Sequence, residues 1–117
     1  MTTAYLLERE VGHVLAALTP SNRLVAQVCL HTGLRLGDVL SLRPQQLAGH
    51  FWLTESKTGK RRQVGLPKPL LAQLRAQAGE DWVFPGRNPA KPRPRQAVWA
   101  AVQRAARAVR LPPNVGP

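Results

Sequence analysis

The sequence predicts a mainly helical α+β fold, with about five helices and a small antiparallel β-hairpin sheet at one edge. Apolar residues recur at helical spacing in most of the 117-residue chain. One stretch, residues 51–66, changes instead to strand-forming residues around a glycine turn. Glycine and proline stand between these segments, where helices end or begin. The length predicts a single domain over residues 1–117, with residues 111–117 as a tail that cannot continue a helix.

The first part of the chain predicts three helices. Apolar residues at i, i+4, i+7, i+8 and i+11 predict an amphipathic helix over residues 3–18. Thr19 is placed as the N-cap of a second helix, residues 20–32, whose first position is a proline that needs no hydrogen-bond acceptor. The third helix, residues 37–42, is short because Pro44 disfavours helical angles in the residue before it.

A single arginine stands at the corner between the second and third helices. Gly33 falls where a helix can end in a left-handed residue, and Asp38 falls in the first turn of the next helix, where the dipole favours a negative charge. Arg35 is therefore placed at a sharp bend, which suits a planar guanidinium that must meet a phosphate or carboxylate in one orientation. The same residues also fit an arginine that merely pairs with Asp38 or covers a helix end.

The middle of the chain predicts a hairpin with a basic tip. Residues 51–55 and 62–66 are the expected strands, and Gly59 supplies the turn between them. Four cations gather at this turn, and their mutual repulsion favours an anionic partner, although a solvated basic turn is the alternative. These cations are Lys57, Lys60, Arg61 and Arg62.

The second half of the chain continues with a helix, an apolar segment and a basic loop. A leucine-rich helix over residues 70–78 is expected to end at Gly79. Residues 82–84 predict a short buried strand or extended piece. Residues 87–94, rich in proline and basic residues, predict an exposed loop along which phosphates could lie.

The last predicted helix, residues 95–110, is the clearest amphipathic element. Its buried stripe is expected to consist of Val98, Ala101, Val102, Ala105 and Val109. Arg104, Arg107 and Arg110 recur every three residues on the opposite side, as either a solvated face or a DNA-facing one.

The charge of the chain lies almost entirely in its second half. The formal net charge is +11, yet the basic and acidic residues of positions 1–56 cancel. Such a one-sided field favours a polyanion, above all nucleic acid, because neutralised phosphates release counterions. The candidate DNA-binding residues are Lys60, Arg61, Arg62, Arg87, Lys91, Arg93, Arg95, Arg104 and Arg107.

The sequence indicates no disulfide, metal, cofactor or membrane-binding site. One cysteine excludes an internal disulfide framework, and the scattered histidines predict no metal site and no cofactor. Tyr5 lies early on an amphipathic helix and is interpreted as structural. The sequence shows no signal peptide and no apolar stretch long enough to cross a bilayer, so a cytoplasmic protein without membrane contact is expected.

Two motifs together resemble the tyrosine recombinase (phage integrase) family. Residues 32–42, Thr-Gly-Leu-Arg-Leu-Gly-Asp-Val-Leu-Ser-Leu, look like the motif that carries the first active-site arginine of that family. Residues 57–66, Lys-Thr-Gly-Lys-Arg-Arg-Gln-Val-Gly-Leu, are similar to its β-hairpin, whose first lysine is catalytic. The resemblance implies that Arg35 and Lys57 are catalytic residues, and that Asp38 supports them by orienting Arg35.

The resemblance also implies that the chain is the first part of a recombinase catalytic domain. The His-x-x-Arg box, a further His or Trp, and the nucleophilic tyrosine of the family have no counterpart in the 117 residues, and Tyr5 precedes Arg35. A truncated catalytic domain of this kind is expected to bind double-stranded DNA without cleaving it. Apolar surface left uncovered predicts a homo-oligomer or a domain-swapped dimer.

Two other classes of function remain open at this point. Residues 25–42 can form a helix-turn-helix of a transcriptional regulator, although the second helix is short and apolar for reading bases. An RNA-binding protein is favoured by charge alone. Against it, the aromatic residues near the basic region, Trp82, Phe84 and Trp99, are expected to be buried rather than available for stacking.

Overall fold

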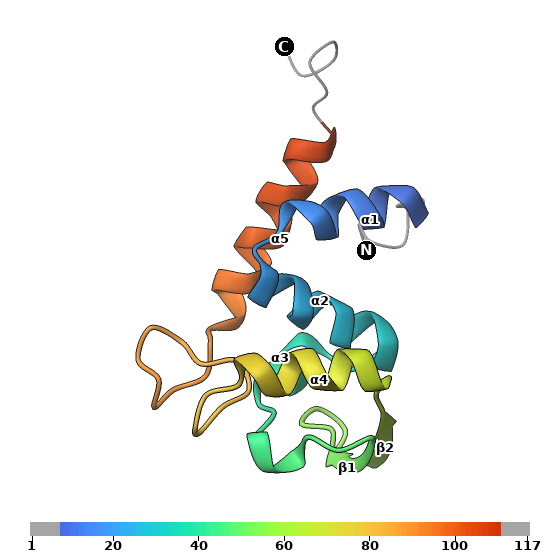
Figure 1. The fold of residues 1–117 in the computed structure, drawn as a ribbon, viewed down its shortest axis with the longest axis vertical. Coiled ribbons are helices and arrows are strands. Elements are labelled where there is room, and N and C mark those ends of the chain that lie inside the picture. The colour runs from blue at the N-terminus through green and yellow to red at the C-terminus, as the bar shows by residue number, and fades with distance from the viewer. Residues whose placement is uncertain (1–7, 111–117) are drawn as a thin grey trace.

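The computed structural model describes residues 8–110, in which several helices pack together and one β-hairpin lies at one end (Figure 1). The predicted α+β, mainly helical fold is confirmed. The elements in chain order are α1 (Glu8–Ala17), α2 (Pro20–Thr32), α3 (Leu36–Leu40), the 3₁₀ helix η2 (Pro44–Gln46), β1 (His50–Thr54), β2 (Arg61–Gly65), α4 (Lys68–Gln77) and α5 (Arg95–Arg110).

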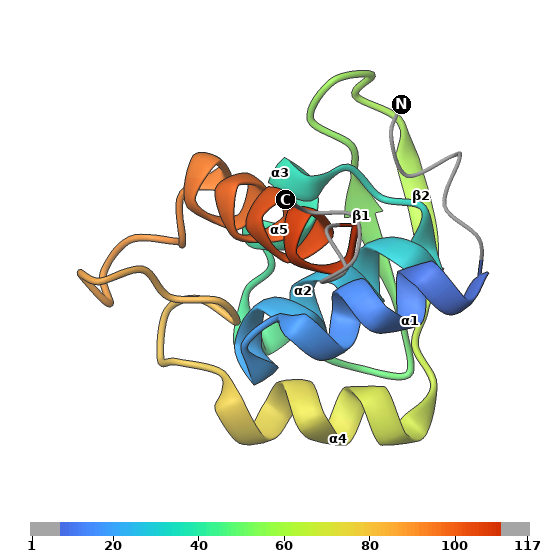
Figure 2. The ribbon, with the colours of Figure 1, turned by 90° about the horizontal axis from the view of Figure 1, so that it is seen from above.

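The elements are stacked along the long axis of an elongated body of 47 × 28 × 28 Å. Figure 1 shows α1 and α5 at one end, α2 and α4 across the middle, and the hairpin at the other end. Helix α5 packs on α1 along one part of its length and contacts α3 with another, so it links the two ends. Figure 2 shows the hairpin and α4 on opposite sides of the molecule.

The predicted boundaries of the second helix are confirmed by its caps. Thr19 accepts a hydrogen bond at Oγ1 from the Asn22 N–H, with 3.4 Å between the heavy atoms. Gly33 adopts φ 69°, and its N–H donates to the Cys29 carbonyl at 2.8 Å. A left-handed residue at this position lets the chain turn sharply toward α3, which is the reason for a glycine.

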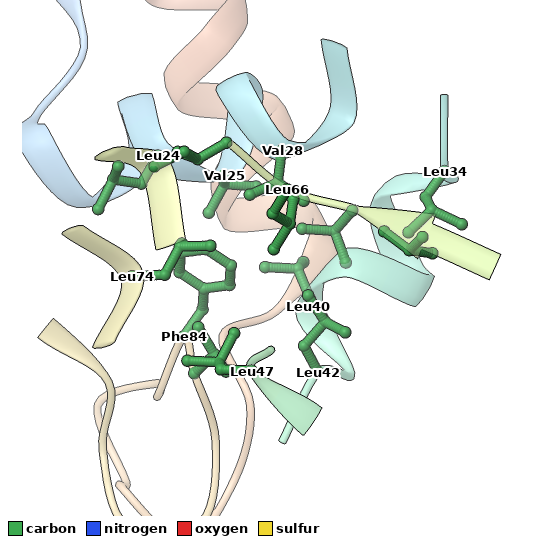
Figure 3. Packing of buried hydrophobic residues seen from close by; sticks show 14 of the residues in the cluster. Leu24, Val25, Val28, Leu34, Leu40, Leu42, Leu47, Leu66, Leu74 and Phe84 are labelled. Atoms are coloured by element: carbon green, nitrogen blue, oxygen red, sulfur yellow. The ribbon is translucent and has the colours of Figure 1, made fainter. Parts of the chain in front are cut away.

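Most buried apolar residues belong to a main core between α2, α3, α4, the hairpin and the segment before α5 (Figure 3). Phe84, Leu42 and Leu74 are its largest fully buried side chains. A second, smaller cluster lies between α1 and α5 and contains the buried residues Val14, Leu18 and Ala105. The main core therefore carries the hairpin and the α2–α3 corner, whereas α1 rests on α5.

Several predicted boundaries shift in the structure. The third helix covers Leu36–Leu40 instead of 37–42, and both strands begin one residue earlier than predicted. The fourth helix ends at Gln77, because Ala78 is already extended; the predicted end at Gly79 is wrong. Residues 3–7 of the first predicted helix and the tail at 111–117 lie outside the described residues, as do the side chains of Val109 and Arg110.

The segment 82–84 is neither helix nor strand and bends at Val83 and Phe84, so the predicted strand or extended piece does not form. Val83 donates its backbone N–H to the Leu42 carbonyl at 3.1 Å, and both Val83 and Phe84 are fully buried. Trp82 is half-buried, and Trp99 is 48% exposed, so the expectation of burial is correct only for Phe84 among the three aromatic residues. The helical pattern placed Trp99 beside the buried stripe of α5, but no element covers its outer side within residues 8–110.

Candidate active site

Arg35 is the N-cap residue of α3 and holds its side chain toward solvent. Its backbone is extended, with φ −69° and ψ 149°, and its carbonyl accepts hydrogen bonds from the N–H groups of Asp38 and Val39 at 3.0 and 3.1 Å. The side chain makes no capping hydrogen bond. The backbone of Arg35 is therefore fixed by the start of α3, while the guanidinium stays exposed and available to an anion.

Asp38 joins the corner to the hairpin. Its side chain is 4% exposed, and Oδ1 accepts a hydrogen bond from the backbone N–H of Ser56 at 3.2 Å. Its second oxygen, Oδ2, is buried and has no partner within residues 8–110. The alternative interpretation, an ion pair of Asp38 with Arg35, is not seen within residues 8–110, where the described ion pair is that of Arg62 with Glu55. Asp38 thus positions the hairpin through Ser56.

Arg62 makes a second connection between the hairpin and the corner. It donates through Nη2 to the Thr32 carbonyl at the end of α2, and its Nη1 lies 3.4 Å from Glu55 Oε2. A Cβ atom at Gly33 would lie 3.3 Å from Arg62 Nη2, which is a second reason for glycine at that position. Arg62 thus differs from Lys57, Lys60 and Arg61, because its guanidinium is engaged by Thr32 and Glu55 while its side chain remains 40% exposed.

The turn between the strands is closed by its own hydrogen bonds. Gly59, at φ 72°, donates its N–H to the Glu55 carbonyl at 2.8 Å, and the Glu55 N–H donates to the Lys60 carbonyl at 2.9 Å. Thr58 donates from Oγ1 to the Glu55 carboxylate at 3.2 Å. These bonds define the turn and leave the side chains of Lys57 and Lys60 exposed.

Arg35 and Lys57 flank the same contact between two elements. Asp38 lies in the first turn of the helix that Arg35 caps, and Ser56 immediately precedes Lys57. Figures 1 and 2 show α3 beside the hairpin in both views. Two cationic side chains are thus carried by neighbouring elements that are joined at Asp38 and at Arg62.

The other candidate DNA-binding residues divide into exposed and engaged groups. Arg93 is only partly exposed; its Nη1 donates to Asn22 Oδ1 at 2.9 Å, which fastens the 87–94 loop to α2. Burial lowers the pKa of the Arg93 guanidinium from its ordinary value. The exposed residues are Lys60, Arg61, Arg87, Lys91, Arg95, Arg104 and Arg107.

Two parts of this site were missed by the sequence reasoning. Ser56 takes part through its backbone N–H, which no sequence pattern identifies. Trp52 is 55% exposed on the outer side of β1, and the Arg61 guanidinium lies 4.7 Å from the centre of its ring. The outward position of Trp52 follows from strand alternation, because its neighbour Leu53 is buried.

Within residues 8–110, no three potential metal-binding side chains of His, Cys, Asp or Glu come together. Burial raises the pKa of the Cys29 thiol to about 11, so this thiol stays protonated at neutral pH. No helix among the described residues is long and apolar enough to span a bilayer.

A mainly helical domain that places an exposed arginine at a helix corner, beside a lysine-bearing hairpin, has the arrangement expected of a tyrosine recombinase catalytic domain. Comparison with known sequences supports this assignment. Residues 4–116 match the phage integrase family, and the chain belongs to this family.

Two phage integrases are similar to the chain, one in sequence and one in fold. Over 84 residues the chain is 31% identical to the integrase of Escherichia phage P2, a match that covers 71% of this chain and 25% of that protein. Its fold is similar to the catalytic domain of bacteriophage HP1 integrase, with a TM-score of 0.64 and 24% identity over 86% of this chain and 58% of that one. The chain thus spans a quarter of the P2 integrase and somewhat more than half of the HP1 domain.

Proposed function

We propose that these 117 residues are the first part of a tyrosine recombinase catalytic domain and bind double-stranded DNA during site-specific recombination. The observation that carries this proposal is the hydrogen bond from Ser56 to Asp38, because it holds the hairpin of Lys57 against the corner of Arg35. Membership of the phage integrase family supports the same function. A protein that works on DNA in this way is expected in the cytoplasm.

The chemistry of DNA strand exchange explains why these two residues belong together. A tyrosine attacks the phosphodiester, negative charge grows on the non-bridging oxygens, and a 5′ hydroxyl leaves. The planar fork of Arg35 is suited to bind the non-bridging oxygens, and Lys57 is suited to protonate the leaving oxygen as a general acid. Asp38 contributes by fixing the backbone next to Lys57.

The 117 residues alone do not supply the whole reaction. They contain no His-x-x-Arg sequence, so the second arginine of the site is absent from them. Their one tyrosine, Tyr5, precedes Arg35 and does not match the nucleophile. We therefore expect DNA binding without a covalent protein–DNA intermediate from this chain by itself.

The two alternative functions receive less support. A helix-turn-helix reader needs several side chains of its second helix in the major groove. Helix α3 has five residues, and Asp38, Val39 and Leu40 among them are buried, which leaves too little surface for reading bases. RNA binding makes a different prediction, namely tighter binding to single-stranded RNA than to duplex DNA.

Binding can be measured by fluorescence anisotropy with a labelled DNA duplex over a series of salt concentrations. We expect log K to fall linearly with log salt, and the slope to become shallower by about 0.9 in Arg35→Ala or Lys57→Ala, because each removes one phosphate contact. Lys68→Ala is the matched control, since Lys68 is an exposed cation on α4, outside the proposed contact surface. No duplex binding at low salt, or equal slopes in all variants, would reject the proposal.

We also propose that the chain self-associates through apolar surface. Leu30 is 60% exposed on α2, although that helix packs into the body of the molecule. Sedimentation at rising protein concentration is expected to show a dimer or larger oligomer that weakens in Leu30→Ser. A monomer throughout the concentration range would contradict this expectation.

A further inference from the structure

The outer face of the hairpin carries a tryptophan that does not contribute to the core. Along β1, Leu53 points into the core and is 8% exposed, whereas Trp52 points the other way and is 55% exposed. A single exposed apolar side chain is common on protein surfaces and by itself indicates nothing. Trp52 differs from such residues in the charged and polar groups that surround it.

A guanidinium is held over the ring of this tryptophan. Trp52 pairs with Gln63 across the hairpin, and Thr54 pairs with Arg61, so Trp52 and Arg61 are diagonal neighbours on the outer face. The Arg61 guanidinium lies 4.7 Å from the ring centre, within the range of a cation–π interaction. No carboxylate pairs with Arg61 in the described part of the chain. This charge is thus held in place without an anion.

The rest of the outer face has no negative charge. Its exposed residues beside Trp52 and Arg61 are His50, Thr54, Gln63 and Gly65. The nearest carboxylate in the sequence, that of Glu55, is engaged by Arg62 and Thr58. The face therefore combines an aromatic surface, a cation and hydrogen-bonding groups, next to the exposed Lys60 at the turn.

The indole N–H of Trp52 is exposed and can donate to water or to an outside acceptor. In Trp82 the corresponding indole nitrogen, Nε1, donates to the Ala90 carbonyl at 3.0 Å. The Nε1–H of Trp52 has no such acceptor among residues 8–110. An indole N–H and an electropositive ring edge beside a guanidinium favour a phosphate, and the ring itself can pack on a sugar. Phosphate and sugar alternate along the DNA backbone.

We propose that Trp52 and Arg61 form an additional DNA contact, in which Arg61 binds a backbone phosphate and Trp52 packs against the adjoining deoxyribose. The contact lies on the face of the hairpin that continues from the turn of Lys57 and Lys60. This inference rests on the proposed DNA binding, for which Arg61 is already a candidate residue, and it adds Trp52. According to this inference, Trp52 contributes to the affinity for DNA although it carries no charge.

A purely structural role for Trp52 makes different predictions. A two-stranded hairpin is marginally stable, and a cross-strand aromatic residue stabilises it. In that case Trp52→Ala lowers the melting temperature but leaves the affinity of the folded protein for DNA unchanged. A DNA contact requires the affinity to fall at temperatures where the variant is fully folded.

The test uses the anisotropy titration with duplex DNA, with circular dichroism to establish that each variant is folded. We expect Trp52→Ala to weaken binding about fivefold without changing the salt slope, because no charge is lost. Arg61→Ala is expected to reduce the slope by about 0.9, whereas Arg61→Lys keeps the slope. Trp52→Phe, which retains an aromatic ring, is expected to bind more tightly than Trp52→Ala.

Trp99→Ala is the matched control, because Trp99 is similarly exposed but has no cation over its ring within the described chain. Its affinity is expected to equal that of the unchanged protein. If the unchanged protein binds DNA and Trp52→Ala binds equally well, or if Trp99→Ala weakens binding as much, the inference is rejected while the proposed function stands. If the unchanged protein does not bind at all, the proposed function itself is rejected.

Discussion

The main core and the α1–α5 cluster hold the chain together in different ways. The main core joins the corner, the hairpin, α4 and the segment of Phe84 through large side chains, most of them leucines and valines. The α1–α5 cluster has three buried residues, and alanines of α5 form much of the surrounding surface. The greater number of buried apolar side chains in the main core implies greater local stability there. The candidate active site is attached to this more stable region.

The hydrogen bonds between elements also differ between these two regions. The hairpin and the corner are joined by the bonds of Asp38 and Arg62, which cross between elements far apart in sequence. At the other end, Arg23 of α2 donates to the carbonyls of Leu15, Ala16 and Leu18 at the end of α1, which is a local connection. A hollow of about 290 Å³ opens beside it, between α5 and the α1–α2 junction. The two hydrogen bonds that join the hairpin to the corner thus lie beside the main core and do not involve α1.

The largest effect is expected from Phe84, which is fully buried in the main core. Phe84→Ala is expected to lower the free energy of unfolding by about 3–5 kcal/mol, which is a large share of the stability of a domain of this size. Urea denaturation followed by circular dichroism measures the change. The control Phe84→Leu is expected to cost about 1.5 kcal/mol. Equal losses in the two variants would contradict the importance of this packing.

A smaller effect is expected from Leu18, which is 5% exposed in the α1–α5 cluster. Leu18→Ala is expected to lower the free energy of unfolding by about 2 kcal/mol, at the low end for a buried leucine, because Leu18 already borders the hollow. Hydrogen exchange is expected to become faster in α1 and to stay unchanged in α4. Equal acceleration in both helices would show that the two regions unfold as one unit.

The smallest effect on stability is expected from the connection at Asp38. Asp38→Ala is expected to cost about 1 kcal/mol, because the Ser56 N–H loses its acceptor but lies near solvent. Asp38→Asn, which keeps an acceptor oxygen, is expected to retain most of this stability and more of the DNA affinity than Asp38→Ala. If both variants bind DNA as well as the unchanged protein, the hairpin does not need this connection.

Local features of the sequence were sufficient for the helices and the turns. The boundaries of α2 follow from Thr19, the proline after it and Gly33, because each acts through its own backbone or side chain on the nearest residues. The range of α5 was predicted in full, since its apolar period is unbroken. The fourth helix was predicted over residues 70–78 but covers Lys68–Gln77. Its end was placed one residue too late because glycine was favoured as the end, whereas the chain leaves the helix already at Ala78.

The sequence by itself determined the fold class, the family motifs and the position of Arg35 at a corner, because these depend on neighbours within a few residues. Only the tertiary structure decided which charged groups are available. Arg62 and Arg93, which look like their exposed neighbours in the sequence, are engaged by Thr32 and Asn22 from distant segments. Asp38 bonds to Ser56 for the same reason: hydrogen bonds between segments depend on how the core packs them together, and the order of residues along the chain does not contain that distance.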